Sequence, residues 1–350
     1  MAARGGVGAA DGTWGALAGA VAVVPDGGLL AVHAHPDDET LASGALLATW
    51  AAAGQRVTVV TCTRGERGEV IDTPAHPTGV GHLEGDGPRL AAHREGELAR
   101  ALAALGVRDH VFLDTSAARE HPAADGVPAA RYTDSGMAWA APGIARAAAE
   151  AELPDGAFVA VPLDEAARRL AAVVRDRRPA VVVTYESGGG YGHPDHVRAH
   201  EVTVRALALL VADGTAVPPL WTVVAPEGAV RAARRALPGL AGVRDLLARA
   251  PVALPDPDEQ LPPLVVPDAA ERAPGARQVP VAPVLDAVVA ALRAHATQVQ
   301  HVGVADEPAD ALVGWYALSN DVLAPLPSHE FYLPSRAALP GSPDPGPPGQ

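Results

Sequence analysis

The sequence predicts an α/β fold, a single Rossmann-like domain with a mostly parallel sheet, helices on both faces and long active-site loops. Two observations predict it. Short apolar runs, typical of buried strands, alternate along the chain with segments of helical periodicity. This alternation is typical of βαβ units, whose strands lie parallel and are joined by right-handed crossovers.

The first half of the chain opens with a short apolar strand. Leu29–His33 is such a run, and the helical segment Thr40–Ala53 behind it ends at Gly54, a natural C-terminal cap. We expect further strands at Arg56–Cys62 and Val111–Leu113, a helix at Arg94–Leu105 that ends at Gly106, and an irregular segment at about 115–155.

The second half repeats the pattern. Leu163–Arg177 reads as a helix with arginines in its last turns, where the helix dipole favours them, and Pro179 ends it. We expect strands at Ala180–Thr184, Leu220–Val224 and Glu330–Leu333, and helices at His196–Val211, Ala229–Leu237 and Val284–Ala294.

These elements predict one domain over residues 28–335. Residues 226–280, rich in Pro, Ala and Arg, read as a variable insertion within it and not as a second core. Residues 1–27 read as a flexible extension, and 336–350 as a disordered tail, because neither stretch has a sustained apolar period.

Composition excludes several classes of protein. The formal charge of −14 argues against non-specific nucleic-acid binding and against anionic membrane surfaces. All 27 basic residues are arginine, which removes P-loop and Schiff-base lysine chemistry. The single cysteine, Cys62, cannot form an internal disulfide, and no apolar run reaches the roughly 20 residues of a membrane span. We therefore expect a cytoplasmic protein with a small-molecule substrate.

Two loops carry an unusual density of imidazole and carboxylate groups. Ala34–Glu39 follows the first strand, and Gly188–His196 follows the strand Ala180–Thr184, so both lie at the carboxyl edge of one sheet. A catalytic zinc needs three protein ligands and an open position. His35, Asp38 and His196 can supply them. In the alternative reading, these Asp and His residues only cap helices and turns.

The remaining polar residues of the two loops suggest catalytic roles. Asp37, beside ligand Asp38, is placed as a general base for a water whose pKa zinc lowers to about 7. Asp195 is expected to hold the imidazole of His193 and raise its pKa, leaving a cation that stabilises an oxyanion or protonates a leaving amine. Tyr191 is expected to donate to the same oxygen. This set suffices for metal-assisted hydrolysis of an amide.

The motifs His35-Pro36-Asp37-Asp38-Glu39 and Tyr191-Gly192-His193-Pro194-Asp195-His196 resemble those of the LmbE-like superfamily of zinc deacetylases, which includes the N-acetylglucosaminyl-phosphatidylinositol de-N-acetylases. Further stretches that carry the resemblance are Val59–Thr63, Arg67–Ile71, Arg94–Leu98, Asp134–Met137 and His295–Val299. The similarity runs from about Leu29 to Leu333 and is interrupted at 226–280.

The resemblance implies the same metal ligands, with zinc, Fe²⁺ or another divalent ion, and assigns sugar and inositol contacts to Glu69, Arg94 and Asp134. It is strongest to members that deacetylate N-acetylglucosaminyl-inositol in mycothiol biosynthesis. A sister activity, the mycothiol S-conjugate amidase, and a deacetylase of another N-acetylglucosaminyl substrate stay as alternatives. Gly192 favours the deacetylase, because the amidase typically has proline there.

Readings from other classes are weaker. Two histidines and a carboxylate also make the facial triad of non-haem iron oxygenases, but those usually sit on a β-barrel, and strand-rich alternation is missing here. A sugar-binding module that only uses a metal for stability needs neither Asp37 nor His193. Cys62 ends an apolar strand and reads as a core residue rather than a nucleophile.

Overall fold

The computed structural model describes residues 27–115, 131–141, 144–147 and 153–335. The predictions for residues 1–27 and 336–350 therefore lie outside it, apart from Gly27. The first elements in chain order are β1 (Gly28–His33), α1 (Asp38–Ala52), β2 (Val57–Thr61), α2 (Gly87–Ala104), β3 (Asp109–Phe112), β4 (Met137–Ala141), β5 (Ile144–Ala147) and α3 (Leu163–Arg177). They continue with β6 (Pro179–Tyr185), α4 (Pro194–Ala212), β7 (Leu220–Pro226), α5 (Glu227–Ala236), α6 (Ala241–Arg249), β8 (Val265–Val266), β9 (Arg277–Pro280), α7 (Leu285–Ala294), β10 (Gln300–Ala309), β11 (Leu312–Ala317), β12 (Leu323–Pro327) and β13 (His329–Ser335).

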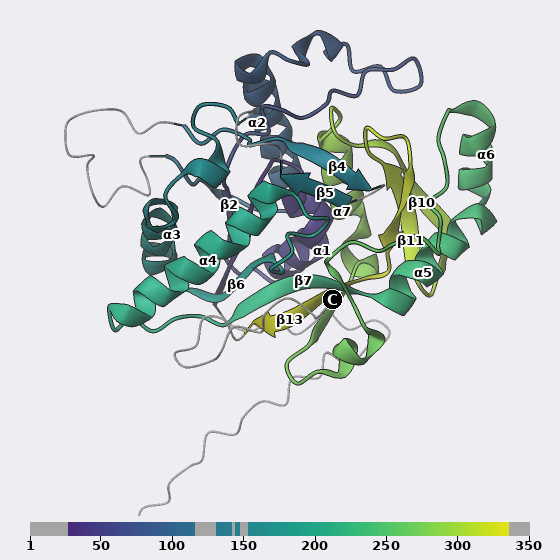
Figure 1. The fold of residues 1–350 in the computed structure, drawn as a ribbon. Helices are drawn as coiled ribbons and strands as arrows, with labels where there is room; N and C mark the ends of the chain where they lie inside the picture. Colours follow the sequence, from purple (N-terminus) through teal and green to yellow (C-terminus); the bar gives the residue numbers. More distant parts are fainter. Residues whose placement is uncertain (1–26, 116–130, 142–143, 148–152, 336–350) are drawn as a thin grey trace, which may run out of the picture.

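The main sheet is mixed but mostly parallel, as the sequence predicts. Its strand order is β3-β2-β1-β6-β7-β13-β9, with β8 paired to β7. Figure 1 shows β6, β7 and β13 side by side in this sheet. Strands β1, β2, β3, β6 and β7 run parallel, whereas β13 runs antiparallel to both of its neighbours, β7 and β9. The order places β1 and β6 side by side, with later strands added outward on either side of them.

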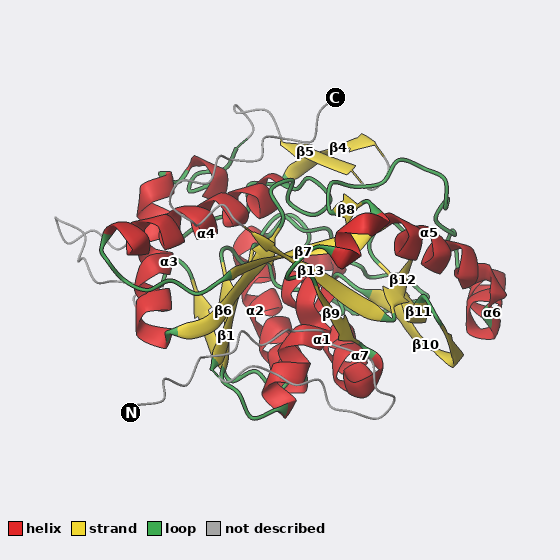
Figure 2. Cartoon of the chain, turned by 90° about the horizontal axis from the view of Figure 1, so that it is seen from below, coloured by secondary structure: helices red, strands yellow, loops and turns green. Residues whose placement is uncertain are grey.

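Helices cover both faces of this sheet (Figure 2). Along β1, Leu29 and Ala31 join the core under α1, α2 and α7, and Leu30 and Val32 join the core under α3 and α4. This alternation is the two-residue period of a strand buried on both faces. It explains why β1 reads as an unbroken apolar run in the sequence.

A third core lies outside the main sheet. Apolar residues of α5 and α6, such as Ala233 and Leu246, pack with Leu312 and Trp315 of the three-stranded sheet β10-β11-β12. Part of residues 226–280, predicted as a variable insertion, thus contributes to a small core that it shares with β10 to β12. The segment looked like an insertion because its partners, β10 to β12, come more than fifty residues later, and Pro, Ala and Arg dominate its composition.

Most element boundaries agree with the predictions, but α2 begins seven residues before the expected Arg94. The carboxylate of Asp86 accepts the N–H of Arg89 (3.4 Å), and Pro88 occupies the first turn, as at many helix N-termini. The glycine at position 87 is a poor helix former, so the sequence did not indicate a helix there. The short antiparallel pair β4–β5 lies within the segment expected to be irregular.

Helix α1 is kinked at Ser43, whose φ is −149°. The backbone N–H groups of Ala45 and Leu46, which follow the kink, donate to the two oxygens of Glu330 on β13 (2.7 and 2.9 Å). Glu330 therefore caps the second half of α1 as an N-terminal residue would cap a new helix.

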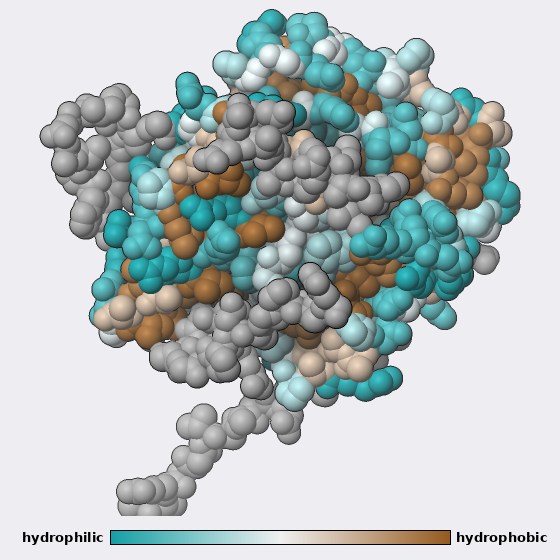
Figure 3. All heavy atoms as spheres, viewed as in Figure 1, coloured by the Kyte–Doolittle hydropathy of each residue, from teal (hydrophilic) through white to brown (hydrophobic). Residues whose placement is uncertain are grey.

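No helix in the described ranges is long and apolar enough to cross a membrane. On the face drawn in Figure 3, hydrophilic and apolar residues are interspersed. Among described residues, the large hydrophobic side chains that are exposed are Leu254 and Val304.

Candidate active site

The two motif loops meet where the strand order changes direction. One loop follows β1 and the other follows β6, and β1 and β6 are neighbours in the sheet. In open parallel sheets, crevices for ligands form outside the carboxyl ends of such a pair, because the connections leave to opposite sides. The topology therefore brings together residues about 160 positions apart, such as His35 and Asp195.

The three expected metal ligands lie in contact. One oxygen of Asp38, Oδ2, lies 3.2 Å from Nδ1 of His35 and 3.3 Å from Nε2 of His196. The rings of His35 and His196 lie 5.3 Å apart, so Asp38 Oδ2 stands between the two imidazoles. All three side chains are buried, and neither ring nitrogen of His196 has a hydrogen-bond partner among the described residues. Unpaired buried nitrogens of this kind fit a metal site.

Among the described residues, two groups have donor atoms that are all close together, and Asp38 belongs to neither of them. Donor atoms of His35, His193 and His196 lie within 4.8 Å of one another, and so do those of His35, Asp134 and Asp195. His35 belongs to both sets and lies at the centre of the cluster. Its donor chemistry, imidazole and carboxylate, suits zinc and other divalent transition metals.

Asp37 has an unusual backbone for a residue with a side chain, with φ at +113°. A conformation of this kind costs about 1–3 kcal/mol and persists where neighbours enforce it. Its carboxylate, 14 % exposed, accepts a hydrogen bond from Nη2 of Arg94 (3.3 Å). Burial raises the pKa of Asp37 to about 7, against the opposing effect of Arg94. A carboxyl group with a pKa near 7 is matched to general-base work at neutral pH.

The pKa of Asp38, one residue later, is shifted in the opposite direction. Burial favours its neutral form, but the imidazoles of His196 and His35 outweigh that effect and hold the pKa of Asp38 well below its usual range. The two neighbouring carboxyls therefore differ in charge preference, which is the pattern expected for one ligand and one base.

The expected pairing of Asp195 with His193 is wrong. The carboxylate of Asp195 accepts from the backbone N–H (2.9 Å) and the hydroxyl (2.5 Å) of Ser135, and lies 3.2 Å from Nε2 of His35. It therefore orients His35. Ser135 lies next to Asp134 in the chain, and no local pattern in the sequence marked it as a partner of this site.

His193 is held by a backbone group instead. Its Nδ1 accepts the N–H of Asp195 (3.1 Å), an arrangement that leaves Nε2 as the protonated nitrogen of the neutral ring. Burial, together with His35 and His196, lowers the pKa of His193 well below the usual value, which is opposite to the expected cation. A neutral imidazole with Nε2–H is a hydrogen-bond donor.

Two tyrosines border His196. The ring of Tyr191 lies 5.0 Å from the His196 ring, as the motif suggests. The ring of Tyr185, a residue without a motif in the sequence, stacks on the His196 ring at 4.2 Å, and its hydroxyl accepts the backbone N–H of Ala34 (2.9 Å). It joins the ends of β6 and β1. As the last residue of an apolar strand, it gave no signal in the sequence.

Gly192 has a conformational reason to be glycine. Its φ is +93°, and a Cβ atom there would lie 2.7 Å from the carbonyl oxygen of Ala145. Proline, with φ fixed near −65°, cannot adopt this conformation. The shape of the loop that presents Tyr191 and His193 therefore depends on this glycine.

The three residues expected to contact substrate lie in different surroundings. Asp134 is buried, with Oδ1 3.7 Å from Nε2 of His35. Arg94 is also buried, and its terminal nitrogens donate to the carbonyl oxygens of Gly65 (2.8 Å) and Pro36 (2.5 Å). Glu69 is exposed on the loop after β2. The structure thus brings Asp134 to His35 and Arg94 to the turn that carries Asp37, and leaves Glu69 at the surface.

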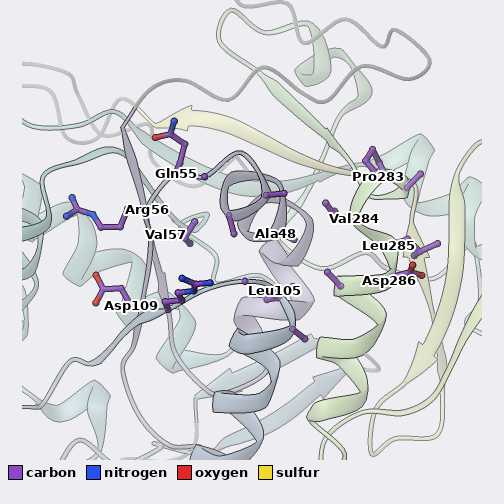
Figure 4. Close-up of a pocket in the computed structure, with 18 residues that line it drawn as sticks. Ala48, Gln55, Arg56, Val57, Leu105, Asp109, Pro283, Val284, Leu285 and Asp286 are labelled. Atoms are coloured by element: carbon purple, nitrogen blue, oxygen red, sulfur yellow. The ribbon is translucent and has the colours of Figure 1, made fainter.

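A cavity of about 850 Å³ lies at the other end of the strands (Figure 4). It is lined by the end of α1, the starts of β2 and β3, and the start of α7, with Arg56, Leu105 and Asp286 among its residues. Its lining contains no histidine. The titratable cluster described above is therefore separate from this cavity.

Comparison with known proteins places this site in a family. The model of the GlcNAc-PI de-N-acetylase (PIG-L) family matches residues 30–207, which contain both motif loops. A protein of Kineococcus radiotolerans named 1D-myo-inositol 2-acetamido-2-deoxy-alpha-D-glucopyranoside deacetylase is 45 % identical over 317 residues, covering 87 % of this chain and 76 % of the relative. Proteins of the same name from Streptomyces avermitilis (41 % identity, 88 % of this chain, 92 % of the relative) and, as deacetylase 1, Saccharopolyspora erythraea (44 %, 87 % and 88 %) are similar over comparable lengths. The chain belongs to the GlcNAc-PI de-N-acetylase (PIG-L, LmbE-like) family.

Proposed function

We propose that this protein is a metal-dependent deacetylase that hydrolyses the acetamide of 1D-myo-inositol 2-acetamido-2-deoxy-alpha-D-glucopyranoside (GlcNAc-Ins), a step of mycothiol biosynthesis. The names of the relatives at 41–45 % identity support the substrate. The observation that carries the reaction class is Asp38 Oδ2, placed between His35 and His196, beside a carboxyl of opposite charge preference, Asp37.

The proposed ligands are His35, Asp38 and His196, and the proposed ion is Zn²⁺, with Fe²⁺ or another divalent metal as the alternative. A divalent ion bound there supplies Lewis-acid polarisation and activates water. His35 is oriented for this task by Asp195, and Asp195 by Ser135. Such outer contacts fix the direction of an imidazole and raise its basicity as a ligand.

In this proposal Asp37 removes a proton from the water that attacks the acetyl carbon. Asp37 then passes this proton to the amide nitrogen as the carbon–nitrogen bond breaks. The products are acetate and the free amine. A group with a pKa near 7 can perform both transfers. His193 donates from Nε2 to the oxyanion of the tetrahedral intermediate, with Tyr191 as a second donor.

Substrate recognition is proposed for Asp134, Arg94 and Glu69. Asp134 borders His35 directly, so its carboxylate is placed to accept a hydrogen bond from a sugar hydroxyl. Arg94 has an additional role, because it binds Asp37 itself. We expect Arg94→Ala to lower kcat for every acetamide substrate, and not only for the inositol conjugate. A cytoplasmic location, which the single cysteine supports, stays a prediction.

The test is a comparison of three substrates with the metal-loaded protein. Acetate release from GlcNAc-Ins is expected to exceed that from N-acetylglucosamine by a large factor, because polar groups matched to the inositol are left unpaired by the free sugar. Cleavage of a mycothiol bimane conjugate is the third arm. If that amide is preferred, the amidase activity replaces the deacetylase, and equal rates on both sugars indicate a broader deacetylase.

A further inference from the structure

The turn at Asp37 needs support from outside its own sequence. With φ at +113°, Asp37 lies in a region that residues with a side chain adopt only under constraint. Its carbonyl oxygen already accepts the N–H groups of Thr40 and Leu41 (both 2.9 Å), which begin α1. The contacts on the other groups of Asp37 therefore decide whether this turn holds.

Glu39 makes one of these contacts. Its Oε2 accepts the backbone N–H of Asp37 (3.0 Å), and its Oε1 accepts Nε2–H of His295 (2.7 Å) and the hydroxyl of Thr40 (2.5 Å). The side chains of Glu39 and His295 are both 0 % exposed. The carboxylate thus joins the strained turn to a residue 256 positions later in the chain.

The turn that carries His295 is itself fixed. It follows α7, and the N–H and hydroxyl of Thr297 donate to the carboxylate of Glu97 (2.9 and 2.6 Å). Glu97 lies on α2, three residues from Arg94, whose Nη2 donates to the carbonyl of Pro36 and to Asp37. Helix α2 therefore supports Asp37 directly on its carboxylate side and indirectly, through the turn after α7, on its N–H side.

We propose that Glu39 and His295 are positioning residues: together they hold the backbone of Asp37 in the conformation that presents its carboxylate at the active site. This inference rests on the proposed function for the role of Asp37 as base. The competing explanation is that the pair only stabilises the packing of α7 against α1, whose residues share a core.

Three single variants of the metal-loaded protein distinguish the positioning role from a role in packing alone. His295→Leu removes the donor, and His295→Gln keeps an N–H near the position of Nε2. His110→Leu is the control, because His110 is a partly buried histidine that contacts a threonine hydroxyl (Thr61, 3.0 Å) on β3 and β2. With GlcNAc-Ins we expect about 10²-fold loss of kcat in His295→Leu, since small displacements of a catalytic group cost this much.

In the same experiment we expect the KM and the metal content of His295→Leu to stay within twofold of the wild type. His295→Gln should recover most of the activity, and the kcat of His110→Leu should be near that of the wild type. In an Asp37→Ala background, His295→Leu should cause no further loss, because residues that act through one another are not additive. An unchanged kcat in His295→Leu, or the same fold-loss without Asp37, would overturn the proposal.

Hydrogen exchange gives a readout that needs neither substrate nor correct folding of His295→Leu. In Glu39→Gln, the side chain keeps a single carbonyl oxygen, for which the N–H of Asp37 and the N–H of His295 compete. The amide of Asp37 should therefore exchange faster than in the wild type. Peptides spanning residues 34–41 report this exchange. Unchanged protection contradicts the inference. Wild-type protein that releases no acetate from GlcNAc-Ins contradicts the proposed function instead, and leaves this exchange test intact.

Discussion

Two adjacent carboxyls, Asp37 and Asp38, show how environment sets function at the scale of one residue. They differ by one position in the chain, yet burial raises the pKa of Asp37 to about 7, and two imidazoles hold that of Asp38 well below its usual range. The backbone turn directs them to different neighbours, Arg94 for Asp37 and the histidines for Asp38.

Substitution should separate these roles. Asp37→Asn is expected to keep the metal and to lose about 10²–10⁴-fold in kcat, the usual contribution of a general base. Asp38→Asn is expected to lose metal, measured by elemental analysis after dialysis. Loss of metal from Asp37→Asn to the same extent as from Asp38→Asn would show that the two assignments are reversed.

Asp195 is expected to act on metal affinity, because its carboxylate contacts His35 and not His193. Asp195→Asn should weaken metal binding by about 10–100-fold, as the removal of partners behind a metal ligand does. Competition with a chelator of known affinity measures this, and Ser135→Ala should weaken it in the same direction. Unchanged metal affinity in Asp195→Asn would remove it from this role.

His193 is expected to be neutral at pH 7, because burial and the neighbouring imidazoles lower its pKa. The group should therefore not produce the basic limb of the pH–rate profile, and His193→Gln, which keeps an N–H donor, should retain more activity than His193→Ala. NMR titration of labelled histidine checks the pKa directly. A value above 6.5 in the protein would restore the acid role that the sequence suggested.

At the scale of an element, helix α1 depends on a group from the far end of the chain. After its kink at Ser43, the N–H groups of Ala45 and Leu46 donate hydrogen bonds to the carboxylate of Glu330. Burial raises the pKa of Glu330 to about 7 from the 4.5 of an exposed glutamate. Since the folded pKa is the higher one, its contribution to stability is full below about pH 4.5 and is lost as pH rises through 7.

Glu330→Gln, which cannot ionise, should therefore gain stability relative to the wild type as pH rises. Between pH 5 and 7 the difference in unfolding free energy should move by about 1–3 kcal/mol in favour of the variant, since one pKa unit corresponds to about 1.4 kcal/mol. Denaturant unfolding at several pH values measures it. A difference that is constant with pH would mean that Glu330 titrates normally.

At the scale of the whole molecule, the parallel half of the sheet and its helices could be predicted, because each element is encoded locally. Leu29–His33 and Leu163–Arg177 are buried or periodic runs with clear ends, and α3 has the predicted bounds. The small core formed by α5, α6 and β10 to β12 could not, because its members are far apart in sequence and individually weak in pattern.

The site divides in the same way. His35, Asp38 and His196 were predicted because their loops follow strands at the same edge of one sheet, and in the structure Asp38 contacts both histidines. The partner of Asp195 was predicted wrongly, because a residue two positions from His193 was assumed to bind it, whereas α4 turns the carboxylate toward Ser135 and His35. Tyr185 gave no sequence signal at all.

The central claim is that one divalent metal, held by His35, Asp38 and His196, is required for deacetylation. The most direct measurement is the metal content of purified His196→Ala, by elemental analysis, alongside acetate release from GlcNAc-Ins. We expect about one metal ion per chain and activity in the wild type, and the loss of both together in the variant. Full metal occupancy in His196→Ala, or undiminished acetate release without metal, would contradict it.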